Sequence, residues 1–460
     1  MAQPARQERD DRLKSKEVLA YGSGDLGMSL AWSLLGTFTT FYLTNVMGIS
    51  AAIAGSVILF SKIFSGIADL LVGVAVDRTR TKMGKARPWM YRWSIPLGIS
   101  FVLFFTVPHF EMTGKIIWTI ITYNLMSTVF YTLVNIPYGT LSPLMTRDSG
   151  SRVKLNIARM LCGVCSGVIA ASITLPVVNA LGGDALAWTK VAACYAIIMT
   201  LLVLLSARFT KERYSFDESP EENAKLSIKQ AVPFLFSNKF WLIMLLSQIA
   251  FFVLQGISNG VNVYYFKYIL GNENAVGLAA VSMALPMLAA ILLSPSLVKK
   301  YGKGKMALFS AFCGICVPLI VLIDPTSLPI ILIKSALTGI TLAPFASVGF
   351  AMLADVCDYS YWKTGIKTEA LINSAASFGA KAGIGVGSAS IGWILAAGSF
   401  DASLPIQPES AITAMKFMMI GLPAILSLLQ FLALMFYNLD KIYPTIIKDI
   451  EDREQRKAGI

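Results

Sequence analysis

Charged residues are scarce in this 460-residue sequence, making up 14% of it against about 25% in an ordinary soluble domain. Hydrophobic residues account for 55%. Several apolar runs exceed the ~20 residues that a helix needs to cross a bilayer, among them 155–182, 187–207 and 411–437. The shortage of charge excludes an ordinary soluble domain, and the long apolar runs predict a polytopic membrane protein.

Histidine is nearly absent, with His109 as the only one, and the six cysteines form no metal-binding arrangement. Cys162 with Cys165 and Cys313 with Cys316 have CxxC spacing, but both pairs lie in apolar runs without further ligands. We therefore expect packing cysteines, no metal and no cofactor.

A membrane-embedded enzyme acting on lipid-linked sugars would need clustered acids or histidines at one membrane surface. Neither DRTR nor DYSYW supplies such a cluster, so we predict that the chain is not an enzyme.

Hydropathy divides the chain into about twelve spans. The first six are 18–47, 51–76, 92–108, 115–145, 155–182 and 187–208, and the others are 233–267, 275–297, 304–323, 328–355, 370–399 and 411–437. We predict an all-α membrane protein whose twelve transmembrane helices form two six-helix bundles. The predicted parts are an N-terminal tail 1–17, a first bundle 18–208, a polar linker 209–232, a second bundle 233–437 and a C-terminal tail 438–460.

Positive charge is unevenly spread over the predicted loops. The loop after the second span carries Arg78, Arg80, Lys82, Lys85, Arg87 and Arg92. The loop TNVMGIS after the first span carries no Lys or Arg, and GSFDASLPIQPES after the eleventh is acidic. Because Lys and Arg collect on the cytoplasmic side, we expect both termini and the linker there. The polar N-terminus lacks the apolar core of a signal peptide, and the net charge of +12 reflects topology rather than a nucleic-acid partner.

The two halves of the sequence have basic loops at corresponding positions. DRTRTKMGK follows the second span of one half and KKYGKGK that of the other, while TRDSGSRVK and DYSYWKTGIKTE follow the fourth spans. Six plus six spans with matching basic turns predict a duplicated transporter. In such proteins the binding site lies between the halves, near the middle of the membrane.

Five ionisable residues lie inside the predicted spans, where a charge costs roughly 2.5–3.5 kcal/mol at the membrane centre on insertion scales. They are Asp25, Lys62, Asp69, Arg159 and Lys381. Lys62, Ser65 and Asp69 follow the i, i+3, i+7 spacing of one helix face, so this face should line the protein interior. The alternative is a structural role, in which Lys62 and Asp69 pair with other buried charges to fix helix packing.

The fourth span carries a polar stripe. Tyr131, Asn135 and Gly139 recur at four-residue intervals, with Thr132 and Tyr138 beside them. Aromatic rings stack on the C–H faces of sugars and amides match hydroxyls, so the stripe suits a sugar-binding cavity that includes Tyr138. Ordinary hydrogen bonding between helices is the alternative.

Four segments, AYGSGDLG, DRTRTKMGKARPW, LVNIPYGTLSP and CDYSYWKTGIKTEAL, resemble motifs of the glycoside–pentoside–hexuronide:cation symporters. This branch of the major facilitator superfamily resembles the chain over nearly its whole length. The resemblance implies two bundles around a central cavity that opens alternately to either side. It implies sugar-binding roles for Asp25, Tyr131, Asn135, Arg159 and Lys381, and cation-coupling roles for Asp69 and Thr132.

The sequence departs from melibiose-type carriers in the second span, where Ser65 replaces an aspartate and Ala68 a polar residue. Metal cations prefer several oxygen ligands, which Asp69 alone does not supply. A single carboxylate among apolar neighbours instead favours its neutral, protonated form. We predict proton coupling through Asp69, with Ser65, Thr132 and Lys62 in the same cation-coupling group. Sodium coupling is the alternative.

The fourth span departs from these carriers too, because Asn135 stands in place of an aspartate. Lys62, Arg159 and Lys381 then face only two carboxylates, and an unpaired buried cation seeks a counter-charge. We predict an acidic glycoside such as a hexuronide, whose acidic group meets Arg159 or Lys381. A neutral glycoside or a pentoside is the alternative.

The loop after the second span resembles the one that latches the bundles on the cytoplasmic side across the superfamily. Its residues are Asp77, Arg78, Lys85 and Arg87, and the alternative is that they set topology alone.

We expect a multi-pass protein of the bacterial inner membrane that works as a monomer, with a small-molecule sugar and lipid as partners. A sensor or scaffold would bind sugar without flux.

Overall fold

The computed structural model describes residues 13–146, 148–214, 238–364 and 369–457, and these parts are helical without a strand. The first half contains α2 (Ser15–Phe41, continued by a π-helix Tyr42–Val46), α3 (Ala51–Asp77), α4 (Arg87–Phe104), α5 (Met112–Asn124), α6 (Tyr131–Met145), α7 (Ser149–Ala180) and α8 (Ala185–Phe209). The second half contains α10 (Lys239–Tyr268), α11 (Val276–Tyr301), α12 (Lys303–Leu319), α13 (Leu328–Thr364), α14 (Glu369–Ala397), α15 (Glu409–Lys416), α16 (Leu422–Met435) and α17 (Leu439–Lys457).

In the described parts these elements give twelve rods of membrane length. A π-helix, Leu125–Phe130, joins α5 to α6, and another, Phe417–Gly421, joins α15 to α16. Eleven rods are long and apolar enough to cross a membrane. The twelfth, α4, is less apolar because its first turns carry Arg87 and Arg92. The predicted all-α membrane fold is confirmed. The predicted tail 1–17 and linker 209–232 lie largely outside the described residues, so the domain boundaries stay predictions.

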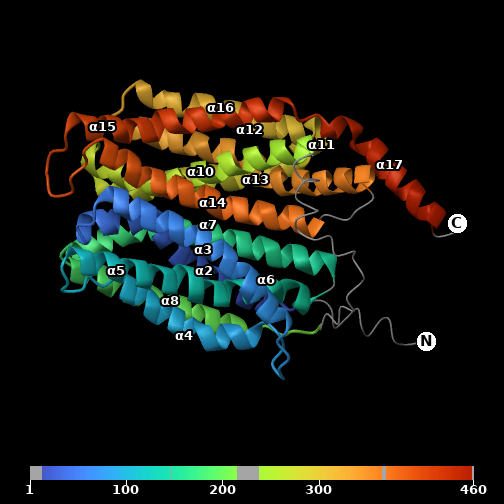
Figure 1. Ribbon diagram of the computed structural model, residues 1–460, viewed down its shortest axis with the longest axis horizontal. Coiled ribbons are helices and arrows are strands. Elements are labelled where there is room, and N and C mark those ends of the chain that lie inside the picture. Colours follow the sequence, from blue (N-terminus) through green and yellow to red (C-terminus); the bar gives the residue numbers. More distant parts are fainter. Residues whose placement is uncertain (1–12, 147, 215–237, 365–368, 458–460) are drawn as a thin grey trace.

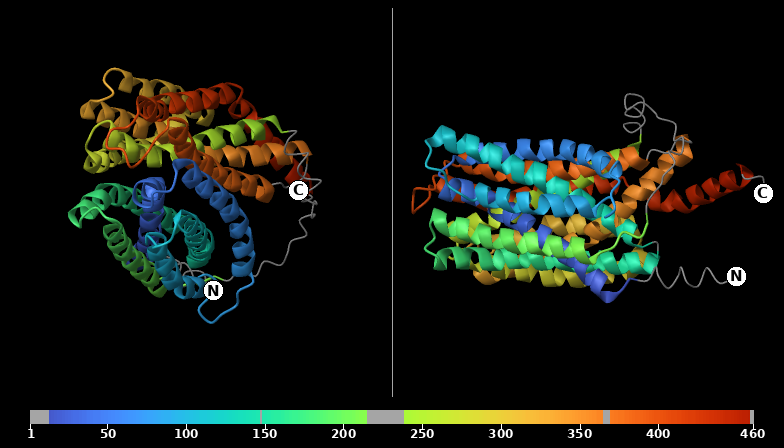
Figure 2. Two further views of the ribbon diagram at one scale, coloured as in Figure 1. Left: turned by 60° about the vertical axis from the view of Figure 1, so that its left-hand side comes forward. Right: turned by 90° about the horizontal axis from the view of Figure 1, so that it is seen from below.

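The two halves lie side by side, α2–α8 in one and α10–α16 in the other, while α17 projects beyond the bundle (Figures 1 and 2). Between the halves, α3 packs on α14, α7 on α11 and α2 on α10. The second helix of each half therefore packs on the fifth helix of the other, and the first helices pack on each other. This exchange is the arrangement expected of duplicated halves around a shared site.

The halves are joined tightly at the end of the bundle opposite the chain termini. There the hydroxyls of Thr44 and Tyr264 lie 2.8 Å apart, and the Asn179 amide donates to Glu273 at 2.9 Å. At the same end α3 and α14 approach so closely that a Cβ on Gly392 would overlap the carbonyl oxygen of Ala51. Glycine is required at this crossing because any side chain would push the two helices apart.

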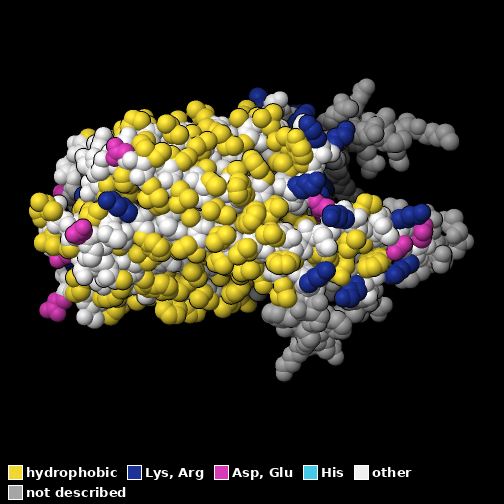
Figure 3. Space-filling model, turned by 90° about the horizontal axis from the view of Figure 1, so that it is seen from above, with side chains coloured by type: hydrophobic (Ala, Val, Ile, Leu, Met, Phe, Trp, Pro, Cys, Tyr) yellow, Lys and Arg dark blue, Asp and Glu magenta, His cyan; other side chains and the backbone are white. Residues whose placement is uncertain are grey.

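The surface of the bundle matches a membrane environment. In the view of Figure 3 hydrophobic side chains cover the flank of the bundle, and Lys and Arg side chains gather at the end where the termini lie. Gly302, at φ 87°, lets α11 turn directly into α12, because this left-handed backbone conformation favours glycine.

Candidate functional site

An ion pair between the two halves lies at the crossing of α3 and α14. Lys381 of α14 donates to the Asp69 carboxylate of α3, and its ammonium lies 3.3 Å from the Ser65 hydroxyl. From α6, the Thr132 hydroxyl donates to the other oxygen of Asp69 at 3.1 Å. The structure therefore gathers Asp69, Ser65 and Thr132, which the sequence assigned to cation coupling, and adds Lys381, which it assigned to the sugar.

Lys62 lies two turns before Asp69 on α3 and is buried. Its ammonium lies 3.6 Å from the centre of the Trp32 ring, and no carboxylate of the described residues forms an ion pair with it. Trp32 in turn stacks on Tyr131 of α6, with the ring centres 4.9 Å apart. A cation over an aromatic face is stabilised without a counter-ion, which explains how Lys62 is held.

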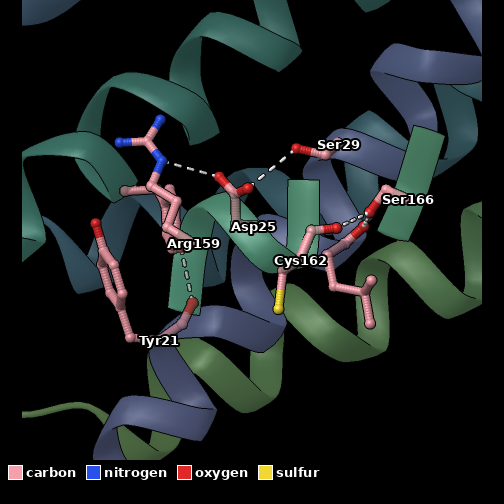
Figure 4. A network of polar contacts seen from close by, with 8 residues as sticks. Tyr21, Asp25, Ser29, Arg159, Cys162 and Ser166 are labelled. Carbon is pink, nitrogen blue, oxygen red and sulfur yellow. Dashed lines mark hydrogen bonds and ion pairs between the residues drawn. The ribbon is translucent and has the colours of Figure 1, made fainter. Parts of the chain in front are cut away.

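A second ion pair joins α2 to α7 within the first half (Figure 4). Arg159 Nε lies 3.0 Å from Asp25 Oδ1, and the Ser29 hydroxyl donates to the other oxygen at 3.1 Å. The Asp25 side chain is only 9% exposed, whereas that of Arg159 is 41% exposed. The two terminal nitrogens of Arg159 make no hydrogen bond with the described residues, so they are available to a ligand.

Tyr138 lies behind this pair. It is fully buried, its ring stacks on Tyr21 at 4.8 Å, and its hydroxyl donates to the Tyr21 carbonyl oxygen at 2.7 Å. The Arg159 guanidinium lies 5.6 Å from the centre of the Tyr138 ring. In this conformation Tyr138 supports Arg159 and does not face a cavity. Asn135, one turn before it on α6, is half-buried.

A cavity of about 220 Å³ lies between the halves. The first half contributes Trp32, Ser33 and Thr37 of α2 together with small and apolar residues of α7. The second half contributes Gln255, Ser258, Asn259 and Asn262 of α10, Lys334, Ser335 and Thr338 of α13, and apolar residues of α11. Amides and hydroxyls beside a tryptophan ring match the groups of a sugar. In the described residues no group of three or more His, Cys, Asp and Glu could hold a metal ion.

Sequence reasoning missed Lys334 and the amide row of α10, although both left a signal. Lys334 interrupts the apolar run LPIILIKSALTG, and it is 8% exposed. Gln255, Asn259 and Asn262 follow the i, i+4, i+7 spacing of one helix face. A search for every polar residue within the spans, rather than for charges in familiar motifs, would have found them.

The predicted gate residues lie at the end of α3 and the start of α4, at the end of the bundle where the chain termini lie. Asp77 and Arg78 are exposed, and Asp77 and Lys85 line a second cavity of about 570 Å³. The Glu212 carboxylate, just beyond α8, accepts three hydrogen bonds of 2.7–3.0 Å from the backbone N–H groups of Lys85, Ala86 and Arg87. Arg87 Nε donates to the carbonyl oxygen of Ala207 at 2.7 Å. In this conformation the loop is held to α8 of its own bundle.

The second half contains an equivalent contact between a carboxylate and the start of a helix. Asp440, which follows α16, accepts a 2.7 Å hydrogen bond from the backbone N–H of Gly304 at the start of α12. In both halves, then, a carboxylate beyond the sixth helix caps the third helix. A carboxylate satisfies N–H groups that a helix start leaves without partners and also complements the helix dipole.

Replacing Glu212 with alanine should lower the stability of the protein by about 1–2 kcal/mol, because three N–H groups lose their acceptor. Thermal unfolding of the purified protein in detergent measures this loss. Glu212→Gln is the matched control, since its amide oxygen keeps one acceptor and the loss should be smaller. An unfolding temperature of Glu212→Ala equal to that of the wild type would contradict the capping role.

Comparisons with known proteins agree with this architecture. The family described as MFS/sugar transport protein matches residues 20–441. The isoprimeverose transporter of Lactiplantibacillus pentosus is 31% identical over 100% of this chain and 96% of its own length. The glucuronide carrier protein homolog of Escherichia coli strain K12 is 26% identical over 97% of each chain. The structure of a bacterial homologue of the human lysosomal transporter Spinster shares the fold, with a TM-score of 0.67 and 12% identity over 98% of this chain and 99% of its own.

Proposed function

The chain belongs to the MFS/sugar transport protein family, in the branch of the glycoside–pentoside–hexuronide:cation symporters, and is a transporter; on this premise we propose that it carries a glycoside together with a proton. Asp69 is the proton site, and the sugar lies between the Asp25–Arg159 pair and the polar walls of the central cavity. The protein works as a monomer in the bacterial inner membrane, with both termini in the cytoplasm. The gathering of Lys and Arg at the end where the termini lie supports this orientation (Figure 3).

The observation that carries the proposal is the ion pair of Asp69 and Lys381, which spans the two halves. A proton on Asp69 removes one charge of this pair and leaves Lys381 without its counter-ion. Occluding an unpaired ammonium is costly, so the protonated protein closes readily only when a substrate supplies compensating groups. Proton binding and sugar binding are thereby linked, and a half-loaded protein does not cross between its two states.

The donor set around Asp69 supports a proton over sodium. The oxygen ligands available to a cation here are the Asp69 carboxylate and the hydroxyls of Ser65 and Thr132. The Lys381 ammonium already donates a hydrogen bond to this carboxylate. A sodium ion would have to displace this ammonium and then be held by few oxygens. The two hydroxyls next to Asp69 are the feature that favours the alternative, a sodium-coupled carrier of neutral glycosides or pentosides.

The glycoside assignment is supported by both the side chains and the relatives. Trp32 and Tyr131 offer stacked rings, and α10 offers three amides. One relative is named an isoprimeverose transporter and another a glucuronide carrier homolog, so neutral and acidic glycosides both occur among the names. We propose the acidic class for this chain, because the cavity between its halves contains a buried lysine, Lys334, that has no carboxylate partner among the described residues.

Counterflow in proteoliposomes tests the proposed function. Vesicles loaded with one glycoside and diluted into a labelled one should exchange the two only if both are substrates. We expect exchange of glycosides, faster for glucuronides than for the matching glucosides. Binding without exchange would identify a sensor and overturn the transporter mechanism, whereas sodium-dependent exchange of neutral glycosides alone would favour the sodium-coupled alternative.

A further inference from the structure

Lys334 differs from the cations of the bundle that lie in ion pairs. Arg159 pairs with Asp25, Lys381 with Asp69 and Lys303 with Asp355, at N–O distances up to 3.0 Å. Lys334 has no carboxylate partner among the described residues. Its hydrogen bond is a 3.6 Å contact from the ammonium to the thioether sulfur of Met419, a weak acceptor. With 8% of its surface exposed, it is a buried cation with an unmet demand for negative charge.

This cation lies in the wall of the cavity between the halves. Of the described side chains that line the cavity, Lys334 is the charged one, and the others are amides, hydroxyls, Trp32 and apolar groups. Ser335 and Thr338 flank it on α13, while Gln255, Asn259 and Asn262 lie on the wall formed by α10. The site therefore combines one positive charge with a ring of groups that match hydroxyls. A sugar that carries a carboxylate has this combination of features.

Three other cations are less suited to hold the acidic group. We expected Arg159 or Lys381 to meet it. In this structure Arg159 is paired with Asp25 and Lys381 with Asp69, and Lys381 loses this partner only while Asp69 carries the proton. Lys62 lies over the face of Trp32, which provides a stabilising environment without an anion. Binding an anion at Lys334 breaks no existing ion pair, and it supplies the counter-charge that burial demands.

We propose that Lys334 binds the carboxylate of the carried sugar, so that the substrate is a uronic acid or its glycoside with the acidic end held by α13. This rests on the proposed function, and it defines the substrate class of that same site. The hydroxyl groups of the sugar face the amides of α10 and the side chains of α2. A monoanionic sugar that enters with one proton on Asp69 moves no net charge, so transport draws on the pH gradient and not on the membrane potential.

Competition binding with two matched probes tests the role of Lys334. The probes are 4-nitrophenyl β-D-glucuronide and 4-nitrophenyl β-D-glucoside, which differ in the carboxylate. The wild-type protein should bind the glucuronide at least about tenfold more tightly. In Lys334→Met, which keeps the chain length and removes the charge, the glucuronide should bind about 10- to 100-fold more weakly, because it loses a charge-assisted hydrogen bond. Binding of the glucoside should change by less than about threefold.

Lys190→Met is the matched control. Lys190 is exposed on α8, so its replacement removes one positive charge and should leave both affinities unchanged. Thermal unfolding adds a second readout. Removing an uncompensated buried charge should leave the unfolding temperature of Lys334→Met equal or higher, whereas a structural lysine would lower it.

Three results would overturn the assignment: unchanged glucuronide binding in Lys334→Met, an equal loss for both probes, or a glucoside preference in the wild type. Counterflow of the glucoside shows whether only the carboxylate site at Lys334 is wrong or the proposed transport function is wrong as well. If Lys334→Met still exchanges the glucoside while glucuronide binding is unaltered, the transporter stands and only the carboxylate site is wrong. If the wild type exchanges neither probe, both proposals fall.

Discussion

We expect Asp69→Asn to abolish uphill sugar uptake while leaving sugar exchange intact. One pH unit corresponds to a tenfold difference in proton concentration, so a gradient of two units supports about 100-fold accumulation with one proton per sugar. The variant should reach a ratio of about one. Asparagine has the shape of the protonated acid and keeps an acceptor for Thr132, but it can neither release a proton nor pair with Lys381. Exchange needs no release of the proton, so it persists.

Uptake and counterflow in the same sodium-free proteoliposomes measure this difference. Asp324→Asn is a matched control in the loop between α12 and α13. The hydroxyl and backbone N–H of Thr326 hold the pKa of the Asp324 carboxyl below its usual value, so it stays ionised over the pH range of the assay. Its replacement should leave accumulation unchanged. Accumulation well above one in Asp69→Asn would remove Asp69 from the coupling step.

Arg159→Lys should lower sugar affinity about 100-fold without unfolding the protein. Lysine keeps a positive charge beside Asp25, so the buried carboxylate retains a partner. An ammonium beside Asp25 can replace at most one of the two hydrogen bonds that we propose the terminal nitrogens of Arg159 donate to the sugar. The loss of the other bond, worth about 1.5–3 kcal/mol for a charged donor, corresponds to the expected decrease in affinity. The KM for uptake and the affinity for a labelled glycoside measure this loss.

Two further variants separate binding from folding. Arg159→Gln alone leaves Asp25 buried without its counter-ion, so we expect a lower unfolding temperature as well as lost uptake. Adding Asp25→Asn restores charge balance, and the double variant should recover thermal stability without recovering uptake. A double variant that transports normally would show that the pair fixes helix packing and does not touch the sugar.

Hydropathy and spacing predicted the fold because the membrane imposes strong local constraints. The cost of removing charge from water requires long apolar runs, and it places Lys62, Ser65 and Asp69 on one face of a helix. These patterns, and the basic loops, can be recognised within a single segment of the sequence, without knowing what the segment packs against. The short α4 was still recognisable from its apolar second half. The π-helical joints within two of the rods were not foreseen, since they depend on packing against neighbours.

The partners of the charges could not be read from the sequence. Asp69 and Lys381 are far apart along the chain, and their meeting depends on the crossing of α3 and α14. Tyr138 has the spacing of a cavity residue, yet the approach of α2 buries it against Tyr21. Lys334 lies outside every motif that suggested a function, and its importance appears only when the cavity around it is seen.

The central claim is that Asp69 carries a proton across the membrane with each sugar. The most direct measurement is the external pH of a weakly buffered, sodium-free suspension of proteoliposomes after sugar is added. We predict alkalinisation that matches labelled sugar uptake at one proton per molecule and that is absent in Asp69→Asn. Sugar uptake that requires sodium and leaves the external pH unchanged would contradict the account.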